Sequence, residues 1–234
     1  MPATLQTFVI ADVLPETPRA VLLRIDLGGR PFAFLAGQVV KAGAPGSPTR
    51  KPYSIASSPE DARERGWIEL LIGLDDQGSA GAHLEVAAGA RIEVEGPLGT
   101  FTFPPDAVER RFVFIAGGTG IAPLRAMMRH ALALPGAQVG LVYSARTPDD
   151  FAFEGEFRAL ARERRIELRQ TVTRAAGADW TGARGRIGRA ELAPLVHDPE
   201  TLCFICGPAS LVDGTKALLE TLGIARERIR VEEW

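Results

Sequence analysis

One stretch of the sequence, residues 112–125, joins an apolar run to a glycine-rich loop and then to a helical pattern. It reads Phe-Val-Phe-Ile-Ala-Gly-Gly-Thr-Gly-Ile-Ala-Pro-Leu-Arg. The five apolar residues are typical of a buried parallel strand, and apolar residues recur at helical spacing from Ile121 to Leu134. Glycines let the backbone approach a ligand closely, and the N–H groups at a helix start favour an anion. The stretch predicts a phosphate-binding loop, although it is neither G-x-G-x-x-G nor a P-loop; an ordinary strand-to-helix turn is the alternative.

The chain changes character near Pro104 and Pro105. Short alternating runs precede this point and predict an antiparallel β-barrel over residues 1–104. Strands and helices alternate after it, which predicts an α/β domain with a Rossmann-like parallel sheet over residues 105–234. The expected strands are 6–14, 20–27, 38–41, 53–57, 67–74 and 91–95, then 112–116, 138–144, 166–173, 202–206 and 228–232. The expected helices are 121–134, 154–165, 189–196 and 210–222.

Composition excludes several classes of function. With 234 residues, of which 46% are hydrophobic and 24% charged, the chain is long enough to bury a large core. A net charge of −2 gives no support for nucleic-acid binding, and no run of eighteen apolar residues suggests a membrane span. Cys203 and Cys206 are the only cysteines, and the three histidines lack metal-ligand spacing. We therefore expect no metal and a cytoplasmic location.

Two loops and one strand edge stand out in the first half. Arg50 and Lys51 precede Tyr53 and Ser54, so cations, an aromatic plane and a hydroxyl lie close together. An ordinary barrel strand with a solvated basic start is the alternative. Residues 78–84 are interpreted as a short helix start, and residues 96–101 as a tight turn that closes the barrel.

Five short motifs follow one another along the chain: Lys-Pro-Tyr-Ser-Ile-Ala-Ser at 51–57, Gly-Pro-Leu-Gly-Thr-Phe at 96–101, Gly-Gly-Thr-Gly-Ile-Ala-Pro at 117–123, Cys-Gly-Pro at 206–208 and Ile-Arg-Val-Glu-Glu-Trp at 229–234. In this order they resemble the signatures of the ferredoxin–NADP reductase superfamily. The resemblance spans residues 5–234 and implies a flavin-binding barrel, a nicotinamide-nucleotide domain and a flavin ring held between them. It implies FAD as the flavin, with FMN as the alternative, and NADPH or NADH as the hydride donor.

The resemblance implies that Tyr53 packs on the flavin ring and that the Ser54 hydroxyl lies near flavin N5. Lys51 stands where the family has an arginine for the flavin diphosphate, which leaves Arg50 as an alternative cation. Gly81 stands where the family has a serine or threonine. The tightness of flavin binding therefore stays open. The flavin-binding residues implied in this half are Arg50, Lys51, Pro52, Tyr53, Ser54, Gly78, Ser79 and Gly81.

In the second half, the resemblance implies a dinucleotide diphosphate at the glycine loop. Cys206 is expected beside the nicotinamide ring, Glu232 is expected to orient that ring, and Trp234 is expected to stack on the flavin. The residues alone also allow a buried small hydrophobe at Cys206, a solvated charge at Glu232 and a frayed terminus at Trp234. The implied cofactor-binding residues of this half are Gly117, Gly118, Thr119, Gly120, Thr173, Arg174, Cys206, Gly207, Pro208 and Trp234. The implied catalytic residues are Ser54, Cys206, Glu232 and Trp234.

The choice between NADPH and NADH depends on the loop after the third strand of the α/β domain. Thr173 and Arg174 resemble the Ser-Arg pair of NADPH-selective members, whereas residues 180–185 also resemble NADH-using members. Asp149 and Asp150 are alternative acceptors for a ribose hydroxyl. We expect a slight preference for NADPH, with both nucleotides accepted.

The implied activity is hydride transfer from NAD(P)H to FAD, followed by electron transfer to a separate acceptor. The acceptors implied are a ferredoxin, a flavodoxin or an oxygenase component, and we expect a monomer. Two alternatives stay open, an NAD(P)H:flavin oxidoreductase that uses flavin as a substrate and an electron-transfer subunit without its own turnover.

Overall fold

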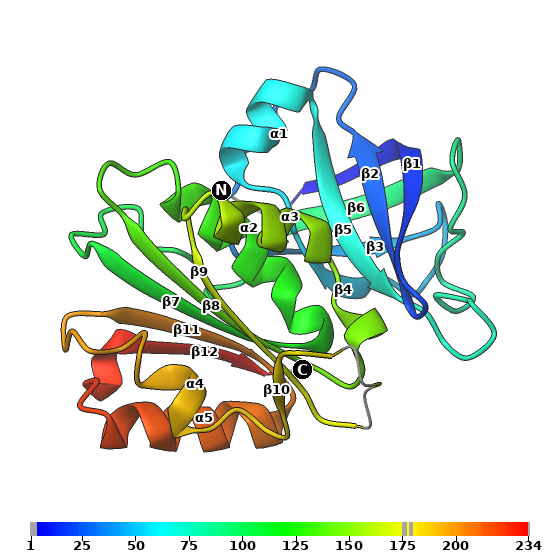
Figure 1. Cartoon of the computed structure of the whole chain (residues 1–234). Coiled ribbons are helices and arrows are strands. Elements are labelled where there is room, and N and C mark those ends of the chain that lie inside the picture. Colours follow the sequence, from blue (N-terminus) through cyan, green and yellow to red (C-terminus); the bar gives the residue numbers. More distant parts are fainter. Residues whose placement is uncertain (1–3, 175–176, 178–179, 234) are drawn as a thin grey trace. The chain divides into compact units, whose positions relative to one another are not determined.

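The computed structural model describes residues 4–174, 177 and 180–233 (Figure 1). The chain forms two compact units. The first unit comprises the residues up to Pro105 together with Arg125–His130, and the second comprises Asp106–Leu124 and the residues from Ala131 onward. The six central residues of helix α2 (Ile121–Ala131) therefore belong to the first unit.

The first unit contains one antiparallel sheet that closes on itself. Its strand order is β4-β3-β6-β1-β2-β5. A bridge between Ile55, just after β4, and Leu70 in β5 joins the two edges, so the sheet is a barrel and the predicted fold is confirmed. Its interior is apolar, with Phe8, Ile25 and Val94 among the buried residues. The strands are β1 (Thr4–Thr17), β2 (Ala20–Asp26), β3 (Val39–Gly43), β4 (Lys51–Ser54), β5 (Trp67–Gly73) and β6 (Arg91–Leu98).

A short helix, α1 (Pro59–Arg65), was missing from the sequence-based prediction. Ser58 is its N-cap: the Asp61 N–H donates to Ser58 Oγ at 3.1 Å, and the Asp61 carboxylate accepts from the Ser58 N–H. Gly66 ends the helix with a φ of 77°. A proline at the first helical position, an acidic residue two positions later and a closing glycine are sequence signals that could have revealed it.

The expected helix start at residues 78–84 was wrong. Gly78 and Gly81 have φ values of 76° and 96°, and such left-handed positions interrupt a right-handed helix. Asp75 Oδ1 instead accepts from the N–H groups of Gln77 and Ser79 and holds a turn. The expected turn at 96–101 is partly strand, because β6 continues to Leu98, which pairs with Val39.

The second unit contains a sheet of six parallel strands in the order β10-β9-β8-β7-β11-β12, and the predicted parallel sheet is confirmed. Strands β7 to β10 extend from β7 in one direction, whereas β11 lies on the other side of β7. The sheet therefore has a topological switch point between β7 and β11. The strands are β7 (Arg111–Gly117), β8 (Gln138–Ala145), β9 (Glu167–Val172), β10 (Ala183–Arg184), β11 (Leu202–Gly207) and β12 (Ile229–Glu233); the two-residue β10 was not predicted.

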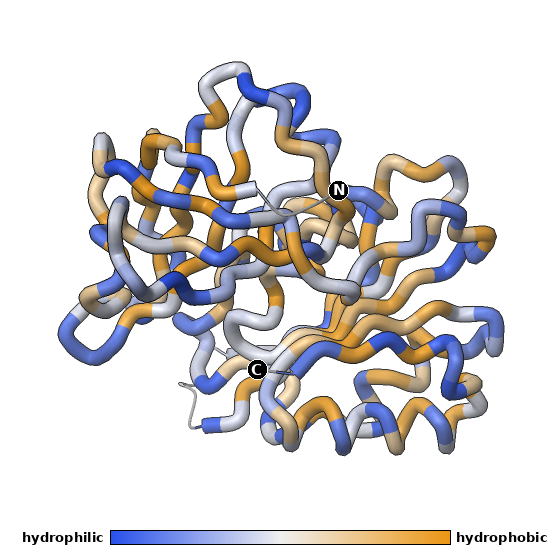
Figure 2. Tube along the Cα trace, turned by 180° about the vertical axis from the view of Figure 1, so that it is seen from behind, coloured by the Kyte–Doolittle hydropathy of each residue, from blue (hydrophilic) through white to orange (hydrophobic). Residues whose placement is uncertain are grey.

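Helices cover both faces of this sheet (Figure 1). Helices α4 (Arg189–Leu192) and α5 (Ala209–Thr221) lie on one face, where Leu192, Val212 and Leu219 pack on Val113 and Ile205. Helix α3 (Glu154–Arg162) lies on the other face and contacts β9. Figure 2 shows the strands of this sheet as largely hydrophobic along their length, as expected for a sheet covered on both sides.

Candidate functional site

The glycine loop lies at the switch point of the parallel sheet. It follows β7 directly, as a 3-10 turn over Gly118–Gly120 that leads into α2. A Cβ at Gly120 would lie 2.4 Å from the Cys206 carbonyl oxygen, and one at Gly117 would lie 2.9 Å from Leu211. Backbone atoms leave no room for a side chain at Gly120, so this position requires glycine and the loop packs against the end of β11. The structure thus brings Gly117–Gly120 together with Cys206, Gly207 and Pro208 at the carboxyl edge where such sheets bind ligands.

Cys206 and Glu232 face each other across β11 and β12. They are register partners, and the Cys206 thiol donates to Glu232 Oε2 over 3.8 Å. Burial, together with the neighbouring carboxylate, raises the pKa of Cys206 above its usual range, so the sulfur is a neutral thiol at pH 7. Burial also raises the pKa of Glu232, although the hydrogen bond from Cys206 opposes this effect. The pair places a compact thiol and a carboxyl group beside the glycine loop.

Tyr143 forms a hydrogen bond with the glycine loop, and the sequence analysis did not identify it. Its side chain is fully buried, and its hydroxyl donates to the Gly118 carbonyl oxygen at 3.0 Å. A phenol directly after the apolar run of β8, close to the carboxyl end of the strand, is the signal that could have found it, since a buried phenolic hydroxyl needs a partner.

Thr173 and Arg174 lie at the carboxyl edge of β9, and both are exposed. The backbone N–H of Arg174 donates to the carbonyl oxygen of Arg146 at 2.9 Å. Arg146 is also exposed and directly follows the adjacent strand β8. Sequence reasoning passed over Arg146, although it is the first charged residue after that strand. The Asp150 carboxylate accepts from both the N–H and the hydroxyl of Thr147 and so caps its own turn.

In the first unit, Tyr53 pairs with a buried histidine. The Tyr53 hydroxyl lies 2.7 Å from Nε2 of His83, and the two rings are nearly parallel with centroids 6.1 Å apart. Burial raises the pKa of Tyr53, and burial together with the charge of Lys51 lowers the pKa of His83. At neutral pH both groups are therefore uncharged. Only 5% of the surface of His83 is exposed.

Cationic groups gather next to this pair. A Cβ at Gly81 would lie 3.4 Å from Nδ1 of His83 and 3.7 Å from Nζ of Lys51. Arg50 pairs with Glu93, while its Nε is buried and has no hydrogen-bond partner among the described residues. The Gly81 N–H donates to Ser79 Oγ at 2.9 Å. At a φ of 96°, a serine or threonine at position 81 would be strained, which accounts for glycine there.

The remaining expected residues are distributed as follows. Pro52 and Ser54 lie in β4, opposite Lys41 and Val39 of β3, and Gly78 lies in the exposed turn before Gly81. Trp234 lies outside the described residues. Over the described residues, no group of three His, Cys, Asp or Glu side chains is placed to hold a metal ion. The same part of the chain contains no helix that is long and apolar enough to cross a membrane.

Two family models match the sequence. The oxidoreductase FAD-binding domain matches residues 17–103, and the oxidoreductase NAD-binding domain matches residues 114–217. Among curated proteins, the chain is 33% identical to ferredoxin–NADP reductase B of Sorangium cellulosum (strain So ce56) over 218 residues, which covers 88% of this chain and 87% of the relative.

Solved structures show the same fold over the whole chain. A ferredoxin reductase in carbazole 1,9a-dioxygenase superposes with a TM-score of 0.83 at 26% identity, covering 100% of this chain and 70% of that one. The cytochrome P450 reductase of Amycolatopsis superposes with a TM-score of 0.84 at 27% identity, covering 100% of this chain and 71% of that one.

Proposed function

The chain belongs to the ferredoxin–NADP reductase superfamily, as an NAD(P)H-dependent flavin oxidoreductase with FAD as its cofactor, and we propose that it delivers electrons to a separate acceptor protein. We assign flavin binding to residues 1–104 and nucleotide binding to residues 105–234. The observation that carries the proposal is the packing of the glycine loop against Cys206-Gly207-Pro208 at the switch point of the parallel sheet.

The residues of the first unit fit FAD. The buried, unpartnered Nε of Arg50 and the ammonium group of Lys51 supply N–H donors and positive charge for a diphosphate. Gly81 leaves the space in front of Lys51 free of a side chain. The half-buried ring of Tyr53 supplies a plane for the flavin ring. This donor set supports bound FAD over flavin used as a free substrate.

In the proposed mechanism, the protein binds and orients the flavin and the nucleotide, and it excludes water from them. Bound FAD would supply the hydride acceptor for NAD(P)H and the capacity to pass electrons on singly or in pairs. The backbone N–H groups of the glycine loop hold the dinucleotide diphosphate, and Cys206 and Glu232 set the position of the nicotinamide ring. The Ser54 hydroxyl is a hydrogen-bond donor toward flavin N5. The neutral Cys206 thiol acts by packing and hydrogen bonding, since a group that stays protonated is a poor nucleophile.

These roles are tested with Ser54→Ala and Cys206→Ala. Both substitutions remove few atoms, so we expect little change in stability and a slower reduction of bound flavin at saturating nucleotide. Stopped-flow absorbance measures that rate, and thermal unfolding measures stability. If both variants reduce flavin at the parental rate, Ser54 and Cys206 have no role in hydride transfer.

A ferredoxin, a flavodoxin or an oxygenase component is the proposed class of acceptor. The named activities of the relatives, a ferredoxin reductase in a dioxygenase and a cytochrome P450 reductase, support this choice. The two free thiols, Cys203 and Cys206, are both buried and suit the reducing cytoplasm.

The test measures NADPH oxidation with a ferredoxin, a flavodoxin, cytochrome b5 and free FAD as acceptors. It uses protein that has passed gel filtration. We expect a yellow protein that turns over fastest with an iron–sulfur or flavodoxin acceptor. A colourless protein that turns over only with added flavin would identify a flavin reductase, and a yellow protein inactive with every acceptor would identify a subunit without turnover.

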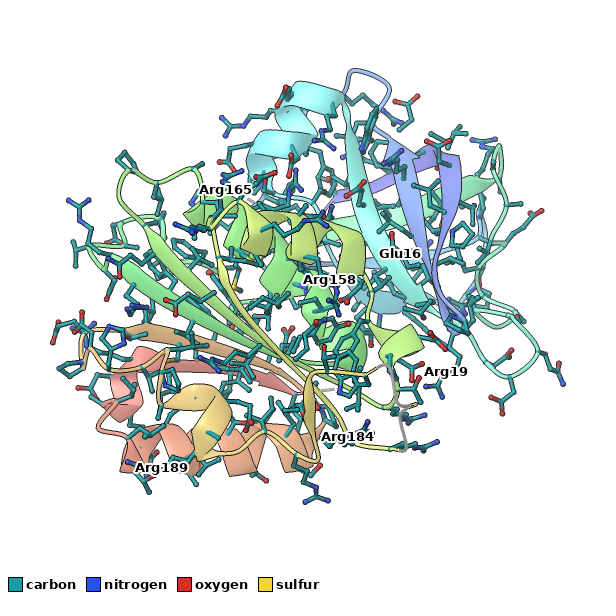
Figure 3. The ribbon with its side chains drawn as sticks, in the orientation of Figure 1. Glu16, Arg19, Arg158, Arg165, Arg184 and Arg189 are labelled. Atoms are coloured by element: carbon teal, nitrogen blue, oxygen red, sulfur yellow. The ribbon has the colours of Figure 1, made fainter. Side chains whose placement is uncertain are left out.

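We further propose a preference for NADPH that Arg146 and Arg174 share. Two exposed arginines at the ends of adjacent strands supply charge for a 2′-phosphate, and one charge-assisted hydrogen bond contributes about 1.5–3 kcal/mol. Arg174→Ala is expected to lower the NADPH-to-NADH ratio of kcat/KM about tenfold to a hundredfold. Arg189→Ala, at the start of α4 (Figure 3), is the matched control and should leave the ratio unchanged. A ratio within about twofold of the parent for Arg174→Ala would rule out this role.

A further inference from the structure

The Tyr143 hydroxyl joins two segments at the carboxyl edge of the parallel sheet. It donates to the Gly118 carbonyl oxygen at 3.0 Å and accepts from the Ala152 N–H at 3.2 Å. Gly118 belongs to the glycine loop, and Ala152 lies just before helix α3. A single buried hydroxyl thus ties the loop after β7 to the connection after β8.

The hydrogen bond to Gly118 fixes the direction of a neighbouring N–H group. Gly118 has a φ of 53°, and its carbonyl oxygen also accepts from the Ile121 N–H. Among the described residues only the bond before Pro97 is cis, so the Gly118–Thr119 peptide is trans. In a planar trans peptide the C=O and N–H bonds point in opposite directions. With its carbonyl held toward Tyr143, this peptide directs the Thr119 N–H away from the Tyr143 hydroxyl.

Aromatic side chains pack around the Tyr143 ring and hold it in place. The Phe151 and Phe157 rings contact it edge-on, with centroids 4.9 Å and 6.3 Å away. Phe151 in turn stacks on Trp180, with centroids 5.5 Å apart. Because Tyr143 is fully buried, its hydroxyl has no freedom to follow a displaced loop.

We propose that Tyr143 is a positioning residue for nicotinamide-nucleotide binding. Its hydroxyl holds the Gly118 carbonyl so that the Thr119 N–H is aimed at the nucleotide diphosphate before the nucleotide arrives. A loop that is already ordered loses less conformational entropy on binding, so the effect falls on affinity. This proposal rests on the role of Gly118–Gly120 under the proposed function.

The test compares Tyr143→Phe with the parent, both loaded with FAD. The substitution keeps the packed ring and removes one hydroxyl. The dissociation constant of NADP⁺, measured by calorimetry, should rise about threefold to tenfold, the loss expected for one buried hydrogen bond. The rate of flavin reduction at saturating NADPH should stay within about twofold of the parent, because chemistry in the filled site is unaffected.

Thr201→Val is the matched control. Thr201 is also fully buried, and its hydroxyl donates to the Asp198 carbonyl oxygen at 2.6 Å at the opposite edge of the sheet. This variant should lose similar stability and keep the parental affinity for NADP⁺. Equal weakening in both variants would show a general effect of stability and would overturn the proposal, as would a Tyr143→Phe affinity equal to that of the parent.

A second measurement uses the parent protein alone. Hydrogen exchange of the Thr119 amide in the parent should slow when NADP⁺ is added, and an unchanged rate would overturn the proposal. A parent that binds neither NADP⁺ nor NAD⁺ would instead contradict the proposed function, so the two failures are distinguishable.

Discussion

At the residue scale, the hydroxyl of Tyr53 binds His83, whereas its ring is the part proposed to pack on the flavin. The hydroxyl lies 2.7 Å from Nε2 of His83, while the half-buried ring lies in the strand that also carries Lys51 and Ser54. The partner holds the side chain in place before any ligand binds. Tyr53 therefore offers a fixed plane, and fixing it in advance lowers the entropic cost of binding.

Replacing Tyr53 with alanine should release most of the bound flavin. Stacking of a flat ring on an aromatic side chain contributes roughly 1–3 kcal/mol, which is up to about a hundredfold in affinity. Tyr53→Phe keeps the ring and should keep most of the flavin. The measurement is the flavin-to-protein ratio after extensive dialysis, and full retention in Tyr53→Ala would remove the ring from the flavin site.

His83 should make stability depend on pH. Its pKa is lowered in the folded protein, first by burial and then by Lys51, from an ordinary value of 6.5. The unfolded chain therefore takes up a proton more readily, so the folded state loses stability as the pH falls below 6.5. In His83→Gln this loss should be smaller. Urea unfolding at pH 7.5 and 5.5 gives the comparison; an equal loss in parent and variant would mean that His83 does not contribute.

At the element scale, an ion pair and a histidine–carboxylate hydrogen bond join helices α1 and α2. Arg129 Nη2 lies 2.7 Å from Asp61 Oδ1, and His130 Nδ1 lies 3.1 Å from Glu60. Further along the same face of α2, the buried Arg125 contacts Glu69 at 2.7 Å. Both members of that pair are almost fully buried, and Glu69 also pairs with Arg24 at 3.1 Å, so one buried carboxylate lies between two arginines. All of these contacts lie within the first unit, which includes Arg125–His130 of α2.

Asp61→Asn should therefore destabilise the protein at neutral pH and not in strong acid. Burial opposes ionisation of Asp61, but hydrogen bonds from Arg129 and Ser58 outweigh it and lower the pKa from 3.8 to about 2. A lowered carboxyl pKa contributes stability that is complete above the unfolded value and disappears as the pH falls toward about 2. The difference corresponds to about 2 kcal/mol. Unfolding free energies from pH 7 downward measure it.

The exposed Asp76 supplies the control for this prediction. Asp76→Asn should change the unfolding free energy by less than about 0.5 kcal/mol at any of these pH values. A difference between Asp61→Asn and the parent that persists unchanged into strong acid would contradict the ionic explanation.

Helices and strands were predictable where their apolar residues repeat regularly along the sequence. The alternating runs identified all six barrel strands, and the apolar run at Phe112–Ala116 identified β7. Helix α1 was missed because its seven residues make only about two turns, too few to show a helical period, and strand β10 was missed because it has only two residues. The helix expected at residues 78–84 failed because its glycines occupy left-handed positions, which composition alone does not distinguish from a helix start.

The candidate site was predictable only in part. The glycine loop, Cys206 and Glu232 follow from short motifs, since each motif encodes a local backbone shape or a strand end. Tyr143 and His83 were missed because their partners, Gly118 and Tyr53, are distant in the sequence. Such pairs depend on which strands become neighbours, and that is decided by the whole sheet.

At the scale of the whole molecule, the proposed function assigns different parts of one reaction to the two units. The barrel holds the cationic and aromatic residues proposed for FAD, and the parallel sheet holds the loops proposed for NAD(P)H. The protein's own side chains supply binding and orientation, so the electron transfer itself depends on the cofactor. The central claim is therefore that this chain, with FAD bound, takes electrons directly from a nicotinamide nucleotide.

An anaerobic titration of the purified protein with NADPH, repeated with NADH, tests that claim most directly. The flavin absorbance is followed after each addition, without any electron acceptor present. We expect a yellow protein whose absorbance bleaches completely with one equivalent of nucleotide per flavin, more readily with NADPH. Bound flavin that stays oxidised in excess NADPH and NADH, yet bleaches with dithionite, would contradict the account.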